Sequence, residues 1–320
     1  MNRQELYDLV TLGESMGVMS PVDAAPLDCA SALHVGVGGA ESNVSIGLAR
    51  LGHSVQWVSR VGNDPFGRKI LRTMRAEGID VSCVSIDPLH ATGIYFKEWL
   101  PDGVTRAHYY RKDSAAAHLS LEDANRMAVG RYLLVTGITV ALSASSRAAV
   151  ERAVERAHLQ GMKIILDPNI RKQLWPSWDE ALRILGSLAQ QADIIVPGIA
   201  EGEAISGHHE APDIAQWFLE RKPGVTVVIK LGQKGAYYHN AVESGYVKGF
   251  RIRERDEVGA GDAFSAGLIS GLLDHLPWRE AVTRACALGA MVAAIPGDFE
   301  GLPTREDLAR FIASQNEPHQ

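Results

Sequence analysis

Four short apolar runs set the architecture of the chain: Tyr132-Leu-Leu-Val-Thr136, Lys163-Ile-Ile-Leu166, Asp193-Ile-Ile-Val196 and Thr226-Val-Val-Ile229. They recur about every 30 residues, and helical stretches such as 146–159 and 178–190 lie between them. Continuous apolar strands that alternate with helices are typical of βαβ units, whose parallel sheet is buried on both faces. The sequence therefore predicts an α/β fold with a mostly parallel central sheet.

The same alternation extends to both sides of these runs. Strands are expected at 7–12 and 55–61, and helices at 44–51, 65–77, 262–274, 279–295 and 305–313. Two segments interrupt the alternation, 14–35 and 90–112, and the second carries two β-rich halves around Pro101-Asp102-Gly103, which predicts a hairpin. The length of 320 residues fits one large α/β domain with an appendage, or two domains.

The composition excludes several classes of function. A net charge of −6 with scattered arginines argues against nucleic-acid binding, which depends on clustered Lys and Arg. No apolar run reaches membrane-spanning length, and the N-terminus lacks the apolar segment of a signal peptide. The three cysteines are far apart and form no metal-ligand pattern, so buried thiols in a reducing cytoplasm are expected.

The stretch Asp256-Glu-Val-Gly-Ala-Gly-Asp-Ala-Phe264 is the candidate for the chemistry. Small residues let backbone N–H groups approach an anion, and the helix expected to follow adds its N-terminal dipole, so the pattern indicates a phosphate site. Asp262 in the first turn suits a group that orients an attacking hydroxyl and accepts its proton. The alternative is an ordinary helix N-cap after a glycine turn.

Polar residues follow the predicted parallel strands at the ends where ligands of such sheets bind, in Asp167-Pro-Asn-Ile-Arg171 and Lys230-Leu-Gly-Gln-Lys-Gly235. A third glycine-rich stretch, Gly36-Val-Gly-Gly-Ala-Glu-Ser-Asn43, precedes a helix, but Glu41 replaces the last glycine of a dinucleotide fingerprint and no Walker lysine follows. These stretches place a binding site along one edge of the sheet.

Taken together, three blocks resemble the ribokinase-like (PfkB) carbohydrate kinase family: Gly38–Asn43 with Leu51-Gly52, Val61–Gly67, and Asp256–Phe264. The resemblance covers nearly the whole chain. It implies a three-layer ribokinase-like domain over 1–320, with a small β-rich lid inserted at about 14–35 and 90–112. It also implies ATP-dependent transfer of a phosphoryl group to a sugar hydroxyl in the cytoplasm, with homodimers formed through the lid and no nucleic-acid or membrane partner.

The resemblance assigns roles to residues in each block. Asp262 becomes the catalytic base, and Gly259, Ala260 and Gly261 form the anion hole. Residues implied at the nucleotide are Asn169, Lys230, Gly232 and Gly235, although a plain strand-to-hairpin turn explains 230–235 equally well. Glu201 is implied at a hydrated Mg²⁺, with a solvated helix-start glutamate as the alternative.

Two positions depart from the family pattern, and both bear on metal binding. Gly198 stands where the magnesium motif has asparagine, which puts the role of Glu201 in question. Glu257 stands where a small residue is usual, which puts in question the monovalent cation that the family can bind nearby.

The substrate assignment depends on arginines. Tyr109-Tyr-Arg-Lys112 and Asp167–Arg171 resemble the 2-keto-3-deoxygluconate kinase branch, which phosphorylates a sugar acid to its 6-phosphate. An arginine fork suits a carboxylate. The resemblance implies substrate contacts from Gly39, Asn43, Tyr95, Tyr109, Arg111 and Arg171. The alternatives are a kinase for a neutral sugar of the fructose, ribose or tagatose type and a catalytically weak sugar-binding regulator. Asp298 is interpreted as a turn residue, with a position facing the site as the alternative.

Overall fold

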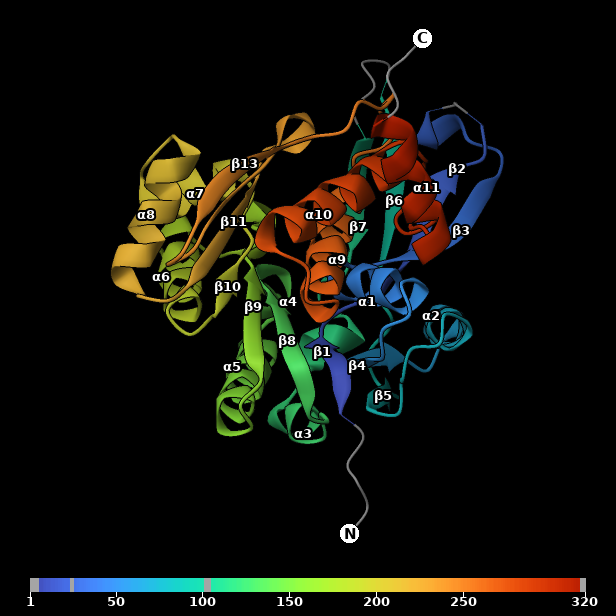
Figure 1. The fold of residues 1–320 in the computed structure, drawn as a ribbon. Helices are drawn as coiled ribbons and strands as arrows, with labels where there is room; N and C mark the ends of the chain where they lie inside the picture. Colours follow the sequence, from blue (N-terminus) through green and yellow to red (C-terminus); the bar gives the residue numbers. More distant parts are fainter. Residues whose placement is uncertain (1–5, 24–25, 101–104, 317–320) are drawn as a thin grey trace.

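The computed structural model describes residues 6–23, 26–100 and 105–316 and places most of them in one three-layer body (Figure 1). A nine-stranded sheet forms its centre, in the order β13-β12-β11-β10-β9-β8-β1-β4-β5. The strands of this sheet are β1 Tyr7–Leu12, β4 Val55–Gly62, β5 Val84–Asp87, β8 Gly130–Thr136, β9 Lys163–Asp167, β10 Ile194–Ile195, β11 Thr226–Lys230, β12 Gly235–His239 and β13 Ser244–Lys248. All neighbouring pairs are parallel except β11 with β12 and β12 with β13.

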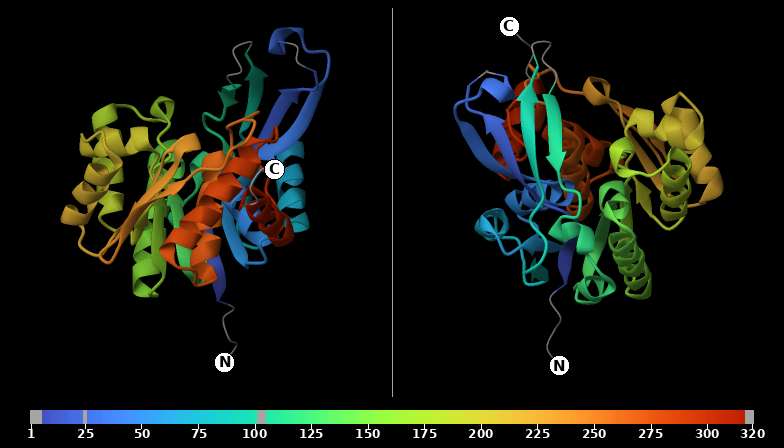
Figure 2. Two further views of the ribbon diagram at one scale, coloured as in Figure 1. Left: turned by 45° about the horizontal axis from the view of Figure 1, so that its top comes forward. Right: turned by 180° about the vertical axis from the view of Figure 1, so that it is seen from behind.

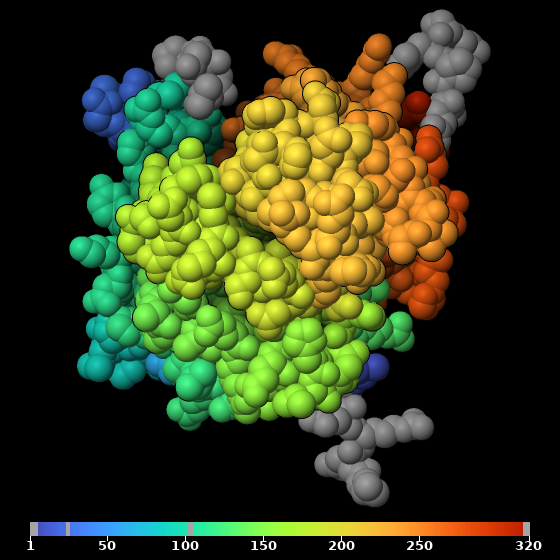
Figure 3. Space-filling model, turned by 90° about the vertical axis from the view of Figure 1, so that its left-hand side faces the viewer, coloured from blue at the N-terminus to red at the C-terminus, as the bar shows by residue number. Residues whose placement is uncertain are grey.

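Successive strand residues point to opposite faces, and both faces are covered by helices. Leu133 packs in one hydrophobic core and Leu134 in the other, as do Val227 and Val228. One face is covered by α1 Ala40–Arg50, α2 Pro65–Ala76, α9 Ala260–Leu273, α10 Trp278–Ala293 and α11 Arg305–Asn316. The other carries α3 Leu121–Asn125, α4 Gly137–Leu142, α5 Ala144–Leu159, α6 Trp178–Ala189, α7 Ile199–Ser206 and α8 Ala211–Arg221. Figure 3 shows the surface made by the α6-to-β13 part in yellow and orange.

A second sheet of four strands stands at the end of the body toward which the parallel strands run (Figure 2). Its order is β3-β2-β6-β7, with β2 Met16–Pro21, β3 Leu33–Gly38, β6 Ile94–Trp99 and β7 Thr105–Tyr110. Met16, Val18 and Tyr95 form its small core. The two segments that interrupt the strand–helix alternation therefore meet in one sheet, although they lie far apart in the sequence.

The predicted elements are present with shifted ends. The hairpin at 94–110 is confirmed, while its turn at Pro101-Asp102-Gly103 lies outside the described residues. The helix expected from residue 44 begins at Ala40, and the strand expected at 193–196 pairs only over Ile194–Ile195.

The expectation of buried thiols was wrong for one cysteine. Cys286 is buried and Cys83 half-buried, but Cys29 is exposed.

Within the part of the chain that the structure describes, no helix is both long and apolar enough to cross a membrane.

Candidate active site

The loop before α9 has the geometry of an anion site. Gly259 caps the helix with φ of +81°, in the left-handed region that only glycine adopts without strain. The Ala260 amide donates to the carbonyl of Glu257, whereas the amides of Gly261 and Asp262 have no acceptor within the described residues. Free amides at the positive end of a helix dipole are a site for a phosphate group.

Asp262 lies in the first turn of α9 and is held from two sides. Asn43, in the first turn of α1, donates from Nδ2 to Asp262 Oδ2 at 2.8 Å, and Asn169 Nδ2 lies 3.5 Å from Oδ1. Burial raises the pKa of Asp262 to about 6; the Asn43 hydrogen bond opposes this rise, while the Asp167 carboxylate adds to it. A carboxylate with this pKa is ionised at neutral pH and still basic enough to accept a proton.

Two cavities meet at the anion loop. The first, of about 440 Å³, lies between the second sheet and the strand ends, and Asp262, Gly259 and all six predicted substrate residues line it: Gly39, Asn43, Tyr95, Tyr109, Arg111 and Arg171. The second, of about 230 Å³, is more apolar and is lined by Gly232, Gly235, Ala260 and Phe264. Lys230, Glu257 and Gly261 line both. A group bound in one cavity can therefore reach a group bound in the other at Gly261.

The predicted nucleotide and metal residues divide between the two cavities. Lys230 Nζ donates to both oxygens of Asp167, at 3.0 and 2.8 Å, so its charge is compensated. Asn169 and Glu201 line the first cavity rather than the second. Both carboxylate oxygens of Glu201 accept backbone amides, from Ile170 at 2.6 Å and Gly198 at 2.7 Å. Such a carboxylate fits a hydrated Mg²⁺ through water better than direct coordination.

Arg111 is buried beneath the second sheet rather than exposed on it. Its Nη2 forms an ion pair with Glu14 Oε2, and its guanidinium lies 5.6 Å from the centre of the Tyr109 ring. The side chain also lines the first cavity, as does that of Arg171. A guanidinium has five N–H donors, and the Glu14 carboxylate uses only part of them.

Several polar residues of the site carried no clear signal in the sequence. Asp298, interpreted as a turn residue, is buried, lines the first cavity and accepts a hydrogen bond from the Tyr95 hydroxyl. Glu14 and Lys97, which pair with buried charges, were not predicted at all. Glu41 is fully buried in α1 and accepts from Thr136 and Thr139, each at 2.6 Å; burial raises its pKa to about 7.

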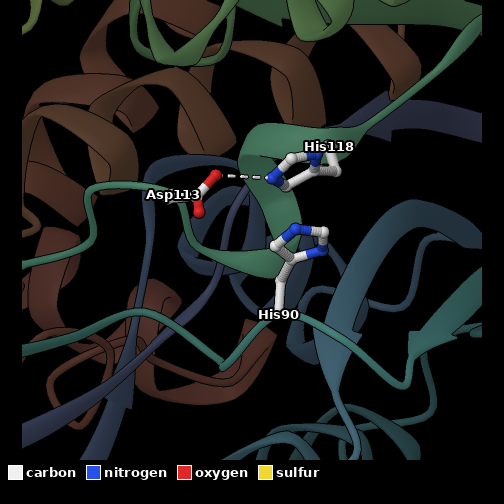
Figure 4. A group of neighbouring side chains, drawn as sticks. All are labelled: His90, Asp113 and His118. Carbon is white, nitrogen blue, oxygen red and sulfur yellow. Dashed lines mark hydrogen bonds and ion pairs between the residues drawn. The ribbon is translucent and has the colours of Figure 1, made fainter.

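A cluster outside the cavities brings His90, Asp113 and His118 together (Figure 4). His118 Nε2 lies 2.7 Å from Asp113 Oδ1, and the two imidazole rings are stacked with centroids 3.5 Å apart and planes 18° from parallel. Imidazole lone pairs lie in the ring plane, so two stacked rings cannot aim both at one ion. We interpret the cluster as a contact between the two linkers that join the β6–β7 hairpin to the body.

Comparison with known proteins identifies the family. The profile described as pfkB family carbohydrate kinase matches residues 7–305. The chain belongs to this family. The predictions of a ribokinase-like carbohydrate kinase and of its fold are thereby confirmed.

Its relatives differ in substrate. The chain is 41% identical to the 2-dehydro-3-deoxygluconokinase of Bacillus subtilis (strain 168), over 98% of both chains. It is 32% identical to Fructokinase-1 of Oryza sativa subsp. japonica, over 98% of this chain and 99% of the relative. Among solved structures, the fructokinase of Vibrio cholerae O395 with bound fructose, ADP and calcium ion has a TM-score of 0.85 and 26% identity, covering 95% of this chain and 99% of that one.

The pKa of Asp262 predicts the acid limb of the kinase's pH profile. If Asp262 is the base that the sequence predicts, protonation of its carboxyl group as pH falls through about 6 prevents it from accepting the hydroxyl proton, so activity falls. We expect kcat to be about tenfold lower at pH 5 than at pH 7. Asn43→Ala removes a hydrogen bond that lowers this pKa, so the midpoint should move to higher pH. Initial rates of the wild type and of Asn43→Ala from pH 5 to 8 give the two midpoints. If the midpoints are the same, the acid limb does not belong to Asp262.

Proposed function

We propose that this carbohydrate kinase transfers the γ-phosphoryl group of ATP to the terminal primary hydroxyl of 2-keto-3-deoxygluconate, the sugar acid also named 2-dehydro-3-deoxygluconate. The observation that carries the proposal is that two arginines, Arg111 and Arg171, line the first cavity. A planar guanidinium suits a carboxylate. The 41% identity to a 2-dehydro-3-deoxygluconokinase supports the same substrate.

The contacts around Asp262 support its role as the base. In the proposed reaction its carboxylate accepts the hydroxyl proton as the hydroxyl oxygen bonds to the γ-phosphorus, and the bond between that phosphorus and the bridging β-oxygen breaks to release ADP. Asn43 holds Asp262 Oδ2, which leaves Oδ1 facing Asn169 and the cavity. The amides of Gly261 and Asp262 stabilise charge on the transferred group.

We place the sugar in the first cavity and the nucleotide in the second. Gly232 and Gly235 line the second cavity, and the missing side chain of Gly232, where a Cβ would meet nothing within 4 Å, leaves room for the nucleotide. Lys230 lies at the junction with the first cavity. The ion pair with Asp167 raises the pKa of Lys230, although burial acts against it, so its charge is retained for the phosphates. Mg²⁺, when bound with ATP, neutralises phosphate charge, and Glu201 would hold it through water.

Two further assignments belong to the proposal. Exposed apolar residues, Leu33 and Val35 in β3 and Val22 just after β2, support a homodimer formed through the second sheet. Dependence on ATP supports the predicted location in the cytoplasm.

Arg111→Lys tests the substrate. Lysine keeps the charge that compensates Glu14 but loses the fork, so kcat/KM for 2-keto-3-deoxygluconate should fall about 10- to 100-fold, the size expected for a lost hydrogen bond to a charged group. Rates with fructose and ribose should change less than about threefold. ADP release over a panel of sugars and sugar acids measures this. Arg106→Lys, at an exposed position on the same hairpin, is the matched control.

The neutral-sugar alternative has one observation in its favour, because Glu14 already compensates the charge of Arg111. Under that alternative the wild type prefers a neutral sugar, and Arg111→Lys changes activity toward acidic and neutral sugars by the same factor. Equal losses for both classes would therefore contradict the sugar-acid assignment.

A further inference from the structure

Lys97 is a buried lysine at the boundary between the second sheet and the body. Its side chain is 2% exposed, and its ammonium group contacts three oxygens. It donates to Asp256 Oδ2 and to the Gly297 carbonyl, both at 3.0 Å, and pairs with Asp298 Oδ1 at 2.6 Å. The first two contacts are hydrogen bonds, and the third is an ion pair.

The three partners belong to the two segments that shape the anion loop. Asp256 opens the loop, and its Oδ1 accepts the amide of Val258 at 3.2 Å. Asp298 forms the opposite wall of the anion loop, because its backbone carbonyl oxygen lies 2.1 Å from the position that a Cβ on Gly259 would take. Lys97 itself comes from β6 in the second sheet. One ammonium group therefore joins the second sheet to both sides of the anion loop.

The charges show why a cation is needed at this point. Asp256 and Asp298 are 2% and 5% exposed, and two carboxylates out of water repel each other unless a cation lies between them. Burial opposes the ammonium charge of Lys97, but the two carboxylates outweigh it and raise its pKa. Without Lys97 the loop would open, take up protons, or admit an ion from solution.

We propose that Lys97 is a positioning residue, a cation built into the chain that fixes the anion loop against the second sheet, so that no monovalent ion from solution is needed there. The proposal rests on the kinase function proposed above and deepens it.

Lys97→Met provides the test, because methionine replaces the lysine side chain without its charge. We expect wild-type kcat to vary less than about twofold when Na⁺ is replaced by K⁺, NH₄⁺ or tetramethylammonium. The variant should lose about 100-fold in kcat, with a smaller change in the KM for sugar. Adding 0.1 M NH₄⁺ or K⁺ should raise the kcat of the variant about tenfold. Tetramethylammonium should not raise it, because it is too large for the space left by the lysine ammonium group. A cavity of about 340 Å³ lined by Lys97, Trp99, Gly297 and Asp298 offers small ions a path.

Binding of a non-hydrolysable ATP analogue, measured by calorimetry, gives a readout that needs no sugar. Its affinity should fall in Lys97→Met and recover with NH₄⁺ even if the sugar assignment proves wrong. Lys163→Met, which removes an exposed lysine paired with Asp193, is the control and should show neither effect. A wild type activated several-fold by K⁺, or a folded variant whose loss no small cation reverses, overturns the proposal. If Lys97→Met does not fold, Lys97→Arg and the wild-type rates in the different salts test the proposal instead. The Lys97→Arg variant keeps a positive charge, so its activity should not depend on the monovalent cation.

Discussion

Asp262→Asn is expected to lower kcat by about 10³-fold, because asparagine cannot accept the hydroxyl proton. The amide is close to the carboxylate in shape, and Asn43 can still donate to its carbonyl oxygen. Its NH₂ group then faces Asn169, whose own side-chain amide can turn to present its oxygen. The free amides at Gly261 and Asp262 belong to the backbone and stay in place. The sugar should therefore bind with an affinity within a few-fold of that of the wild type, while turnover is nearly lost.

Coupled ADP release gives kcat for this variant, and calorimetry with the sugar gives its affinity. Asp213→Asn, at an exposed position in the first turn of α8, is the matched control because it makes the same chemical change far from the cavities. Turnover within tenfold of the wild type would remove Asp262 from the role of base. The same result would leave Asp262 a structural role as the hydrogen-bond partner of Asn43 and Asn169.

Gly259→Ala should lower both activity and stability. A Cβ at this position would lie 2.1 Å from the Asp298 backbone carbonyl, and the residue has φ of +81°. The left-handed conformation alone costs alanine about 1–2 kcal/mol in the free energy of unfolding. The clash with backbone must also move the anion loop or the Asp298 segment, so we expect kcat to fall by at least about 100-fold, the size of losing an anion-hole donor.

Substitutions at two other glycines separate the effect of backbone strain from that of moving the anion loop. Gly224 has φ of +87°, and no atom lies within 4 Å of the place that a Cβ would take, so Gly224→Ala carries the conformational strain without the clash. Gly186 lies inside α6 with equally open space and ordinary φ, so Gly186→Ala should stabilise the protein by about 0.5–1 kcal/mol. Denaturant unfolding and steady-state kinetics measure all three. If Gly259→Ala behaves like Gly224→Ala in both assays, the loop does not position the phosphate.

Some of the site could be predicted because its signals are local. Gly259, Gly261 and Asp262 lie within four positions of each other at a helix start, and a glycine turn before an apolar helix is visible in any such sequence. The start of α1 at Ala40 was missed because its first turn, Ala40–Asn43, lacks apolar periodicity. That turn is buried nevertheless, since the second sheet and Asp262 cover it.

Buried charges were missed for a different reason. Lys97 sits in a β-rich run where a single lysine is typical of a solvent-facing position, and its partner Asp256 is 159 positions away. Arg111 was predicted at the substrate without its partner Glu14, and Asp298 was interpreted as a turn residue. In each case the residue type was visible, but the opposite charge belonged to another segment.

The amino-acid order by itself determined the layered α/β architecture, the anion loop and the candidate for the base, because periodicity, glycine and a helix start act between near neighbours. Only the tertiary structure decided which charges pair, how far burial raises the pKa of Asp262 and Glu41, and where the two cavities meet. These properties depend on the loss of water around a group and on which distant strand comes to lie beside it, and neither is encoded within any one stretch of the chain.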